Sequence, residues 1–471
     1  MPKTKISALP PRVEISCAMA LDGKLSYRGR LCALSGKPDW ARVYGMRAKF
    51  DAILVGSNTI IIDNPSLSSH GFGADPVKVV LDSMLSVPAS SRIFEHGTVV
   101  MVHSGRAQAG SKLAISKASG AKVIFCQVRG NEKLDPEKAL AALRRLGIKS
   151  VLVEGGASTM RSFLESGLSS RMHVFVAPMV FGGTDSQTTT ISNGRPFPVP
   201  AYFNFESVEL CGYGFVLHLL KRHPNASPIK SNFRPQWDSR LNTVRTFPAT
   251  PKSSAKSKNR IPKVTISCAM TIDGKIAYSH GNLVLSDRLD WERTFRDRAA
   301  SDAVLVGASS SSIVPHPYGS YGFGPEPLKV ILDPHLRTPP NARIFENSNS
   351  VIFHAAAASK SRLEKFRAMQ GVSLVRMQRR RFSPKKILAI LGRLGVKTVL
   401  VEGGGRTINS FLREGSFDKI RIFISPQVIS GDDSTSISLA QGKAFKKPVK
   451  LRLARVQLQG VGALAEFERK R

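Results

Sequence analysis

A six-residue motif, Val151–Gly156, places an acid and two glycines at the end of a predicted strand, where a ligand could bind. The β-branched apolar run that starts at Val151 ends in Glu154, Gly155 and Gly156, and a helical pattern follows. This order predicts a strand, a tight turn and a helix N-terminus. Backbone N–H groups at such a turn can hold a phosphate, and the glycines let the backbone approach it closely. Glu154 could orient hydroxyl groups or help to move a proton there.

The same motif also has a purely structural interpretation. A lone glycine-rich turn is a weak signal, because an ordinary strand–turn–helix unit contains one. In that case the Glu154 carboxylate only stabilises the positive end of the adjacent helix. The motif gains weight because it occurs a second time, from Val399 to Gly405, with Thr407 in the place of Thr159.

A second polar cluster follows a predicted strand at Ala52–Val55. Gly56 stands at the end of this strand, and Thr59 and Asp63 follow it, four residues apart. If one helical turn connects them, the hydroxyl and the carboxylate share a face. Parallel sheets bind their ligands at this carboxyl end of the strands. Taken alone, however, Thr59 and Asp63 could merely cap and terminate the turn.

The elements that must position these clusters alternate between strand and helix, which predicts an α/β domain with a mainly parallel sheet. In the first half of the chain, strands are predicted at Val13–Met19, Ala52–Val55, Val77–Leu81, Val99–His103, Lys122–Cys126, Ser150–Glu154 and Met172–Ala177. Helices are predicted after Gly156, at Arg42–Phe50, and at Pro136–Leu146 with Asp135 as N-cap. A closing antiparallel hairpin is predicted from the apolar stretches Tyr202–Leu210 and Gly214–Leu220.

The chain repeats itself at long range. An offset of 251 residues relates Asp22 to Asp273, and an offset of 248 residues relates Glu154 to Glu402. A period of this length indicates domain duplication rather than a solenoid. We therefore predict a first domain, a linker and a second domain at residues 1–222, 223–261 and 262–471, respectively. The linker is rich in Pro, Ser, Asn and basic residues, which is typical of a flexible, solvated tether.

Length and composition fit this organisation. A chain of 471 residues exceeds one ordinary core, and 42% hydrophobic with 22% charged residues indicates a globular protein. No run of about 18 apolar residues and no apolar N-terminal segment occur, so we expect neither a transmembrane helix nor a signal peptide. The five cysteines form no CxxC pair, and their number is odd. This pattern argues against a disulfide framework or a metal site and favours the reducing cytoplasm.

The net charge of +35 is unusually high. Such a charge predicts attraction to polyanions, whether nucleic acid, an anionic membrane or phosphorylated metabolites, but it also fits a solvated surface. Basic runs such as Arg379–Arg381 are usually solvated rather than functional. No RNA-binding aromatic signature or helix-turn-helix accompanies them. Composition alone therefore leaves the partner open.

A series of short motifs occurs in a fixed order in the first repeat: Leu21-Asp22-Gly23-Lys24, Asp39-Trp40, Arg47-Ala48, Gly56 with Thr59, Asp63-Asn64-Pro65, Leu81-Asp82-Ser83, Val153-Glu154-Gly155-Gly156, and Ala177-Pro178 with Gly182-Gly183. In order and spacing this series resembles the reductase of riboflavin biosynthesis, whose fold is like that of dihydrofolate reductase. The resemblance covers nearly all of the first repeat and, more loosely, most of the second. It implies two tandem dihydrofolate-reductase-like domains. Bacteria often fuse this reductase to a zinc deaminase, whose HxE and PCxxC elements the sequence lacks.

The resemblance implies an NADPH-dependent reduction that opens the ribose of a ribosylaminopyrimidine 5′-phosphate to a ribityl chain. The pyrimidine could be the 2-amino or the 2-oxo form. The implied cofactor contacts are Ala18, Thr59, Asp63, Ser83, Gly155, Gly156, Ala157 and Ser158, and the implied substrate contacts are Ser35, Arg47, Leu67 and Glu154. Glu154 and Asp63 are the candidate catalytic residues. Arg47 suits the substrate phosphate because its planar guanidinium pairs with oxygens bidentately.

The sequence also departs from the family pattern. The family usually holds substrate with a basic residue where this chain has His70. In the second repeat the positions of Thr59, Asp63, Asn64 and Leu67 hold Ser310, Val314, Pro315 and Tyr318. Because a valine cannot accept a hydrogen bond from a cofactor, we expect a catalytic first repeat and a degenerate second one. Family members form homodimers, so the two repeats would pair as a pseudo-dimer within one chain.

Two alternatives remain open. Both repeats could have lost catalysis, and the basic chain could bind nucleic acid on a reductase scaffold. The polar set Thr59, Asp63 and Asn64 argues against this alternative, because a scaffold has little reason to keep it. The same fold could instead reduce another pterin- or pyrimidine-like substrate, for which His70 leaves room. No membrane partner is expected.

Overall fold

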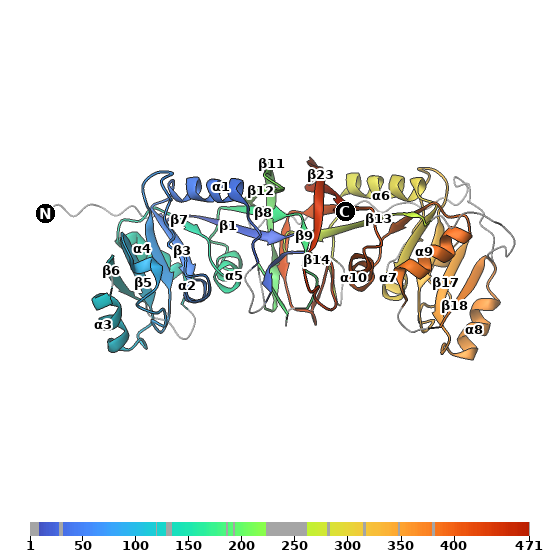
Figure 1. The fold of residues 1–471 in the computed structure, drawn as a ribbon, viewed down its shortest axis with the longest axis horizontal. Coiled ribbons are helices and arrows are strands. Elements are labelled where there is room, and N and C mark those ends of the chain that lie inside the picture. Colours follow the sequence, from blue (N-terminus) through green and yellow to red (C-terminus); the bar gives the residue numbers. More distant parts are fainter. Residues whose placement is uncertain are drawn as a thin grey trace. The chain divides into compact units, whose positions relative to one another are not determined.

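The structure is a computed structural model that describes residues 9–27, 32–118, 120–128, 134–184, 187–191, 194–222, 261–279, 283–313, 317–346, 349–378 and 382–470. The chain forms two compact units (Figure 1). The first unit comprises Met1–Ala177, Asp185–Ala226 and Pro426–Asp432, and the second comprises Pro178–Thr184, Ser227–Ser425 and Asp433–Arg471. Each unit therefore includes a short segment from the other repeat. The predicted linker and Arg379–Arg381 lie outside the described residues, apart from Ile261.

The first unit is built on a ten-stranded sheet with the order β21-β11-β12-β8-β1-β7-β3-β4-β5-β6. Its strands are β1 (Arg12–Ala20), β3 (Ala52–Gly56), β4 (Val77–Leu81), β5 (Thr98–His103), β6 (Lys122–Gln127), β7 (Ser150–Val153), β8 (Arg171–Ala177), β11 (Pro196–Cys211), β12 (Gly214–Lys221) and β21 (Gln427–Ser430). The strands from β8 to β6 run parallel, whereas β12 is antiparallel to β8 and to β11. The predicted parallel sheet and closing hairpin are thus confirmed.

In the described part of the first unit, five α-helices lie between these strands. They are α1 (Lys37–Arg47), α2 (Ser57–Asp63), α3 (Ala109–Ala118), α4 (Pro136–Arg145) and α5 (Ala157–Glu165). The N-cap prediction for α4 is confirmed, because the Asp135 carboxylate accepts from the Glu137 N–H at 2.9 Å. The prediction for α1 was shifted: the helix begins five residues earlier than Arg42, where Pro38 occupies its first turn. A two-stranded sheet of β2 (Lys24–Tyr27) and β10 (Thr188–Thr190) was not predicted.

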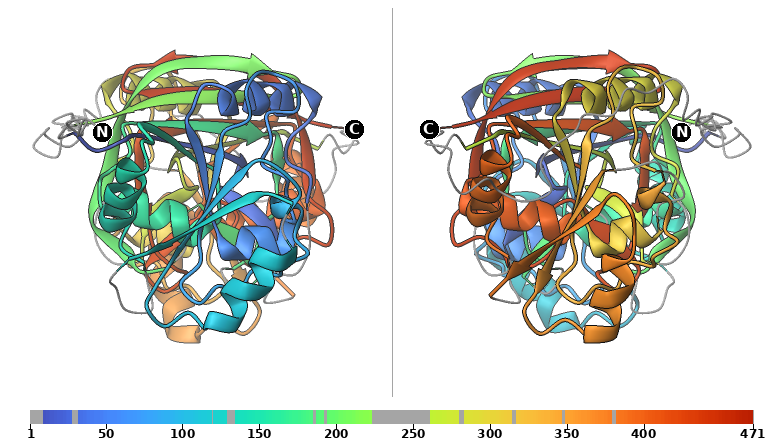
Figure 2. Two further views of the ribbon diagram at one scale, coloured as in Figure 1. Left: turned by 90° about the vertical axis from the view of Figure 1, so that its left-hand side faces the viewer. Right: turned by 90° about the vertical axis from the view of Figure 1, so that its right-hand side faces the viewer.

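The helices cover both faces of the sheet. In the left view of Figure 2, α4 and α5 lie on one side of the twisted sheet, and α1, α2 and α3 lie on the other. Right-handed crossovers require this division, because the chain moves outward to β6 and then returns through β7 to β8. On the α2 side, Ile60 and Ile115 pack against Val55 and Val80 in one apolar cluster. This packing fixes α2 at the carboxyl end of β3.

The second unit has the same architecture, with the sheet order β18-β17-β16-β15-β19-β13-β20-β24-β23-β9. Its strands are β9 (Met179–Val180), β13 (Lys263–Thr271), β15 (Ala303–Gly307), β16 (Leu328–Leu332), β17 (Ser350–Ala355), β18 (Val372–Met377), β19 (Thr398–Val401), β20 (Lys419–Ser425), β23 (Val449–Gln459) and β24 (Gly462–Arg469). A separate pair is formed by β14 (Lys275–Tyr278) and β22 (Ser436–Ser438). The matching strand orders confirm that the duplicated sequence folds twice into one α/β architecture.

The helices of the second unit are α6 (Arg288–Ala300), α7 (Ala308–Ile313), α8 (Lys360–Arg367), α9 (Pro384–Arg393) and α10 (Gly405–Glu414). They follow the strands in the same order as α1 to α5 (Figure 1). No helix in the described parts of either unit is long and apolar enough to cross a membrane.

Candidate active site

The candidate site of the first unit lies where four neighbouring parallel strands end. In the sheet order, β1, β7, β3 and β4 are adjacent. Glu154 directly follows β7, Gly56 closes β3, Ser83 comes two residues after β4, and Ala18 lies near the end of β1. The structure thus brings most of the predicted contacts to one edge of one sheet. Ligands of parallel sheets bind at this edge.

The central feature of the site is an ion pair between Arg47 and Glu154. Arg47 Nε lies 2.9 Å from Glu154 Oε1, and Arg47 Nη2 lies 2.7 Å from Glu154 Oε2. Only 5% of Arg47 is exposed, whereas the Glu154 carboxylate keeps some access to solvent. Two parallel hydrogen bonds of this kind fix the carboxylate in one orientation. Arg47 is therefore placed to position Glu154, and its predicted contact with a substrate phosphate stays a prediction.

The loop after α2 holds Arg47 from its other side. Arg47 Nη1 donates to the Ser68 carbonyl at 3.0 Å, and its guanidinium lies over the Tyr44 ring at 5.5 Å. Tyr44 in turn packs against His70, with ring centroids 4.2 Å apart. Leu67 is 2% exposed, and both Leu67 and His70 adopt the left-handed conformation (φ 55° and 50°). Because such φ values are uncommon for non-glycine residues, they mark a loop held in place by its surroundings.

The glycine turn before α5 is closely packed. A Cβ added to Gly155 would lie 2.6 Å from Val55 Cβ, so the end of β3 leaves no room for a side chain. Gly156 is the N-cap of α5 and has φ 52° and ψ 140°, a conformation that essentially only glycine adopts. A Cβ on Gly156 would lie 3.2 Å from Thr59 Oγ1. The turn therefore lies directly beside α2.

Helix α2 carries the two polar residues predicted after β3. The predicted helical turn between Thr59 and Asp63 is confirmed, and Asn64 ends α2 in the left-handed conformation. Thr59 faces the turn at Gly156, and Asp63 is exposed at the end of α2. Partial loss of hydration raises the pKa of the Asp63 carboxyl. Both residues therefore lie on the same side of the site as the α5 N-terminus.

Two of the predicted substrate contacts, Ser35 and Arg47, lie at opposite ends of α1. Ser35 precedes α1, and its hydroxyl donates to the Asp39 carboxylate. Arg47 closes the same helix, so about 16 Å of helix separates the two predicted substrate contacts. Asp82, which belongs to the motif series, is buried and accepts from the Val87 N–H at 2.9 Å, which gives it a structural role in the loop after β4.

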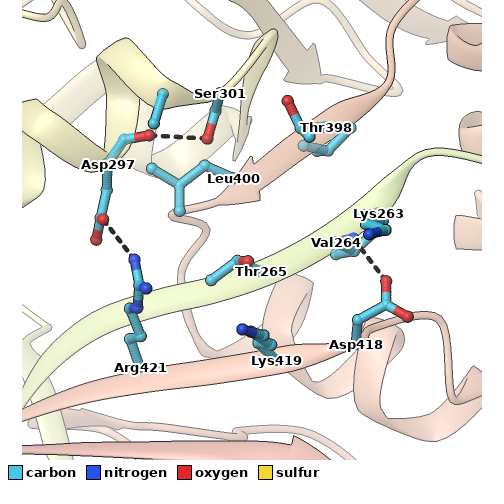
Figure 3. A pocket seen from close by; sticks show the side chains of 12 residues that line it. Lys263, Val264, Thr265, Asp297, Ser301, Thr398, Leu400, Asp418, Lys419 and Arg421 are labelled. Carbon is cyan, nitrogen blue, oxygen red and sulfur yellow. Dashed lines mark hydrogen bonds and ion pairs between the residues drawn. The ribbon is translucent and has the colours of Figure 1, made fainter.

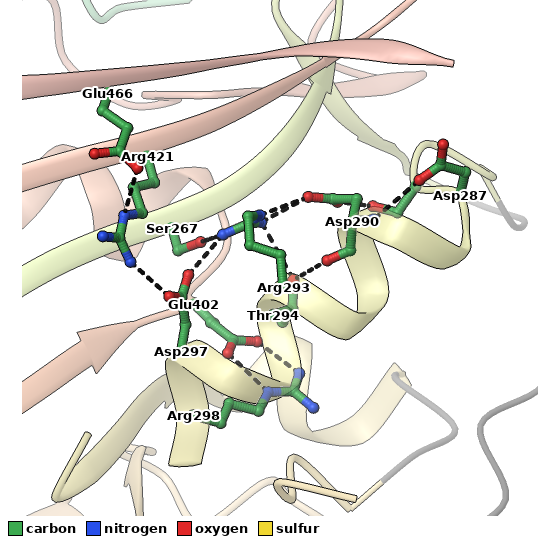
Figure 4. A network of polar contacts seen from close by, with 11 residues as sticks. Ser267, Asp287, Asp290, Arg293, Thr294, Asp297, Arg298, Glu402, Arg421 and Glu466 are labelled. Atoms are coloured by element: carbon green, nitrogen blue, oxygen red, sulfur yellow. Dashed lines mark hydrogen bonds and ion pairs between the residues drawn. The ribbon is translucent and has the colours of Figure 1, made fainter. Parts of the chain in front are cut away.

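The second unit keeps the central ion pair (Figure 4). Arg298 Nε lies 2.8 Å from Glu402 Oε1, and Arg298 Nη2 lies 2.7 Å from Glu402 Oε2. The surroundings of the pair differ, because Tyr318 replaces Leu67. The Tyr318 ring lies 5.1 Å from the Arg298 guanidinium, and its hydroxyl donates to the Ser310 carbonyl of α7 at 3.3 Å. The substitutions at Val314 and Pro315 lie outside the described residues.

Sequence reasoning missed the partner of Arg47 and the roles of Tyr44 and Ser68. One signal for the pairing was available, because an arginine and a glutamate occur at the same positions of the second repeat. The second repeat keeps Arg298 and Glu402 although it has lost the acid that corresponds to Asp63. The retained pair therefore indicates a contact that the fold itself needs.

The family model of the RibD C-terminal domain matches residues 11–217 and again residues 262–465. The chain belongs to the RibD C-terminal domain family. The two matches confirm both the family indicated by the order of the motifs and the tandem duplication. The Arg–Glu pairs described above therefore stand at equivalent positions of two RibD C-terminal domains.

Relatives of this RibD C-terminal domain chain match it over most or over about half of their own length. The 2,5-diamino-6-ribosylamino-4(3H)-pyrimidinone 5′-phosphate reductase of Methanothermobacter thermautotrophicus is 32% identical over 188 residues, or 39% of this chain and 85% of that protein. The riboflavin biosynthesis protein RibD of Actinobacillus pleuropneumoniae is 33% identical over 214 residues, or 44% of this chain and 56% of that protein. A solved pyrimidine reductase-like protein from Corynebacterium diphtheriae is 18% identical with a TM-score of 0.37, covering 46% of this chain and 96% of that one.

Proposed function

We propose that the first unit catalyses the NADPH-dependent reduction of a ribosylaminopyrimidine 5′-phosphate to its ribityl form, a step of riboflavin biosynthesis. The observation that carries this proposal is the Glu154 carboxylate, which Arg47 holds in one orientation directly before the turn at Gly156, whose positive φ the second unit does not share at Gly404. The archaeal relative named as a reductase of such a phosphate supports the substrate class. Turnover measured with the 2-amino and with the 2-oxo pyrimidine distinguishes the two substrates.

The residues of the first unit fit a dinucleotide cofactor. Among the described residues, no side chain caps the N-terminus of α5, so its first N–H groups can receive a phosphate. Gly156 provides the close approach that such a contact needs. We propose that NADPH is held by Ala18, Thr59, Asp63, Ser83, Gly155, Gly156, Ala157 and Ser158. When bound, NADPH supplies the hydride, and the protein supplies position and electrostatics.

The proposed roles of the chain's own residues follow from their contacts. Glu154 accepts hydrogen bonds from ribose hydroxyls or moves a proton at the sugar as the ring opens. Arg47 acts through Glu154, because its guanidinium is already directed at that carboxylate. Asp63 accepts a hydrogen bond from the cofactor. Ser35 and Leu67 complete the proposed substrate contacts.

We propose further that the second unit is a degenerate partner of the first. Tyr318 packs beside its Arg–Glu pair, and the sequence lacks the acid that would correspond to Asp63. In this proposal residues 1–222 form the catalytic domain, residues 262–471 the degenerate domain, and residues 223–261 the linker, with the repeats paired inside one chain. Cys17, Cys126, Cys211 and Cys268 are free thiols, which supports a reducing, cytoplasmic location.

Titration calorimetry with NADPH on the full chain tests this proposal. We expect one site per chain at moderate salt, and NADPH oxidation when the ribosylaminopyrimidine phosphate is added. Asp63→Ala should weaken NADPH binding by about 10- to 100-fold, the size expected for losing a hydrogen bond to a charged group. Because the pKa of Asp63 is raised by partial burial, NADPH affinity should fall as the pH drops through that pKa.

The converse variant, Val314→Asp with Pro315→Asn, should raise the stoichiometry from one NADPH to two per chain. Wild-type protein that already binds two would refute the degenerate assignment. Absence of any NADPH binding would refute the proposed reductase and favour polyanion binding by the basic chain. A polyanion complex would weaken steeply with rising salt, which a defined cofactor pocket does much less.

A further inference from the structure

The second unit contains a cavity at the edge of its sheet opposite to the Arg298–Glu402 pair. The cavity measures about 280 Å³ and lies between the C-terminal end of α6 and the first residues of β13, β19 and β20 (Figure 3). Lys263, Thr398 and Lys419 are the first residues of those three strands, whereas Glu402 follows the last residue of β19. The cavity is therefore separate from the candidate active site.

A substitution between the repeats accounts for the cavity. In the first unit the corresponding space is filled by Phe50, which is 8% exposed and lies 4.9 Å beneath the Arg12 guanidinium. The second repeat has Ser301 at this position. The Ser301 hydroxyl turns back to donate to the Asp297 carbonyl at 2.8 Å. Loss of the phenyl ring thus leaves open space next to the sheet.

The charges along the same face also differ between the units. In the first unit each cation of this face has a carboxylate partner: Arg12 lies 3.4 Å from Glu14, and Arg171 lies 2.9 Å from Glu206. The second repeat keeps the cations as Lys263 and Lys419 but replaces the two acids by Thr265 and Ala454. The second unit has therefore kept the two positive charges and lost these two carboxylates, while it has gained Asp297, Asp418 and Glu468 where the first has Met46, Ser170 and Leu220.

Two acids of the second unit line the cavity, Asp297 and Asp418, and each has a hydrogen-bond partner other than the two lysines. The two Asp297 carboxylate oxygens bind Arg421 and Arg293. Asp418 accepts from the Val264 N–H at 2.8 Å. Figure 3 shows Arg421 turned to Asp297 and Asp418 bonded to the backbone at Val264.

Glu468 lies opposite Lys419 on the neighbouring strand and forms its ion pair with Arg452. Among the described residues, neither Lys263 nor Lys419 has an ion-pair partner.

The two lysines are close enough to share one ligand. Thr265 pairs with Lys419 across β13 and β20, so Lys263 and Lys419 are diagonal neighbours on the sheet. Strand spacing puts their Cα atoms about 8 Å apart, a distance that two flexible four-carbon side chains can close on one anion. The Thr265 side chain lies between them on the same face. Ammonium groups around a cavity recognise phosphate and carboxylate as point charges.

We propose that this cavity of the second unit binds a small dianion, a phosphate or a dicarboxylate, between Lys263 and Lys419. The site goes beyond the proposed reductase activity and does not depend on it. It also gives the second unit a binding role that its altered active site does not provide.

Calorimetric titration of the full chain with inorganic phosphate and with malonate, at constant ionic strength, tests the proposal. With the first unit saturated with NADPH, we expect one further saturable site per chain with an affinity in the millimolar range or tighter, about −4 kcal/mol. The probe that binds more tightly identifies the anion class. Ser301→Phe, which restores the residue of the first unit, should abolish binding, and Lys419→Gln should weaken it at least several-fold. Ser301→Ala keeps the cavity open and should bind like wild type.

A matched variant in the first unit separates this site from general attraction to a basic protein. Phe50→Ser opens the corresponding space but keeps Glu14 and Glu206, so it should create no second site. If Ser301→Phe does not fold, Thr265→Glu provides the same test, because it restores the carboxylate beside Lys419 and should abolish binding. Failure of wild type to bind either probe by about 10 mM, or unchanged binding in Thr265→Glu, overturns the proposal. NADPH binding should be the same in all these variants.

Discussion

The two units keep the same ion pair and differ in the turn that follows it. Arg47 with Glu154 and Arg298 with Glu402 have nearly identical geometry. The next turn departs, because Gly156 has φ 52° and Gly404 has φ −64°. The second repeat also has a third glycine, Gly405, where the first has Ala157. The pair therefore persists without the turn that accompanies it in the first unit, so the pair alone does not identify an active unit.

A second contrast lies beneath α1 and α6. In the first unit His173 and His218 face each other with Nδ1 atoms 2.7 Å apart. The second repeat has Arg421 and Glu466 at these positions, and they form an ion pair at 3.2 Å. There Arg421 also joins Asp297 and Arg293 in a network along α6 (Figure 4). One unit thus has two imidazoles where the other has an arginine and a glutamate.

The sharpest test of the first contrast is a pair of matched amide substitutions. Glu154→Gln keeps the size of the side chain but removes the carboxylate, and we expect turnover to fall by about 10²- to 10⁴-fold, as for the loss of a general acid–base group. Glu402→Gln makes the same change in the second unit and should leave turnover unchanged. Steady-state NADPH oxidation measures both variants, and NADPH titration verifies that the cofactor site of each is intact.

Equal losses of turnover in the two variants would contradict the assignment of catalysis to the first unit. A rise in the Michaelis constant of Glu154→Gln with unchanged kcat would show that Glu154 binds substrate without taking part in proton transfer.

A smaller effect is expected from alanine at the two turn glycines. Gly156→Ala places a side chain at φ 52°, with its Cβ 3.2 Å from Thr59 Oγ1. It should cost about 1–3 kcal/mol of unfolding free energy and weaken NADPH binding. Gly404→Ala meets Ser310 Oγ only at 3.4 Å and has ordinary φ, so it should be neutral or stabilise by about 0.4–1 kcal/mol. Denaturant unfolding measures the change in unfolding free energy of both variants. Equal losses in Gly156→Ala and Gly404→Ala would show that the two turns do not differ in their need for glycine.

Most of the sheet could be predicted from the sequence. Strands such as Val77–Leu81 were found at their observed bounds, because β-branched runs between turn residues carry a strong local signal. The same holds for the α2 turn and for the Asp135 cap. Helix α3 was missed, because Ala109–Ala118 has little apolar periodicity.

The candidate site was less predictable, because its main contact is not local. Arg47 and Glu154 are 107 residues apart in sequence, and no periodicity reveals which acid an arginine will meet. Leu67 and His70 adopt left-handed φ values that their residue types disfavour. The surrounding fold imposes that conformation, so the sequence around these residues gives no sign of it. The residues of the site could be predicted one by one, but not their pairing.

The smallest expected effect concerns the histidine pair of the first unit. With its proton on Nε2, His173 donates to Glu14 at 2.8 Å, so its Nδ1 accepts from His218. Burial, with the neighbouring His173 and Arg42 acting in the same direction and Glu209 in the opposite one, lowers the pKa of His218. The hydrogen bond from His173 lowers the pKa of Glu14. Glu14 thus contributes stability above its unfolded pKa of about 4.3, and this is lost only at lower pH.

The lowered pKa of His218 predicts a loss of stability as the pH falls below neutral. Unfolded His218 takes up a proton near pH 6.5, whereas the folded side chain does so only at lower pH, so the first unit loses stability as the pH falls below about 6.5. Hydrogen exchange of β8 and β12 should show this loss, while β20 and β24, which carry Arg421 and Glu466, should keep their protection. His218→Gln should remove the loss. Protection that falls equally in both units, or that still falls in His218→Gln, would show that other groups titrate. The contrast between the histidine pair and the arginine–glutamate pair would then have no consequence for stability.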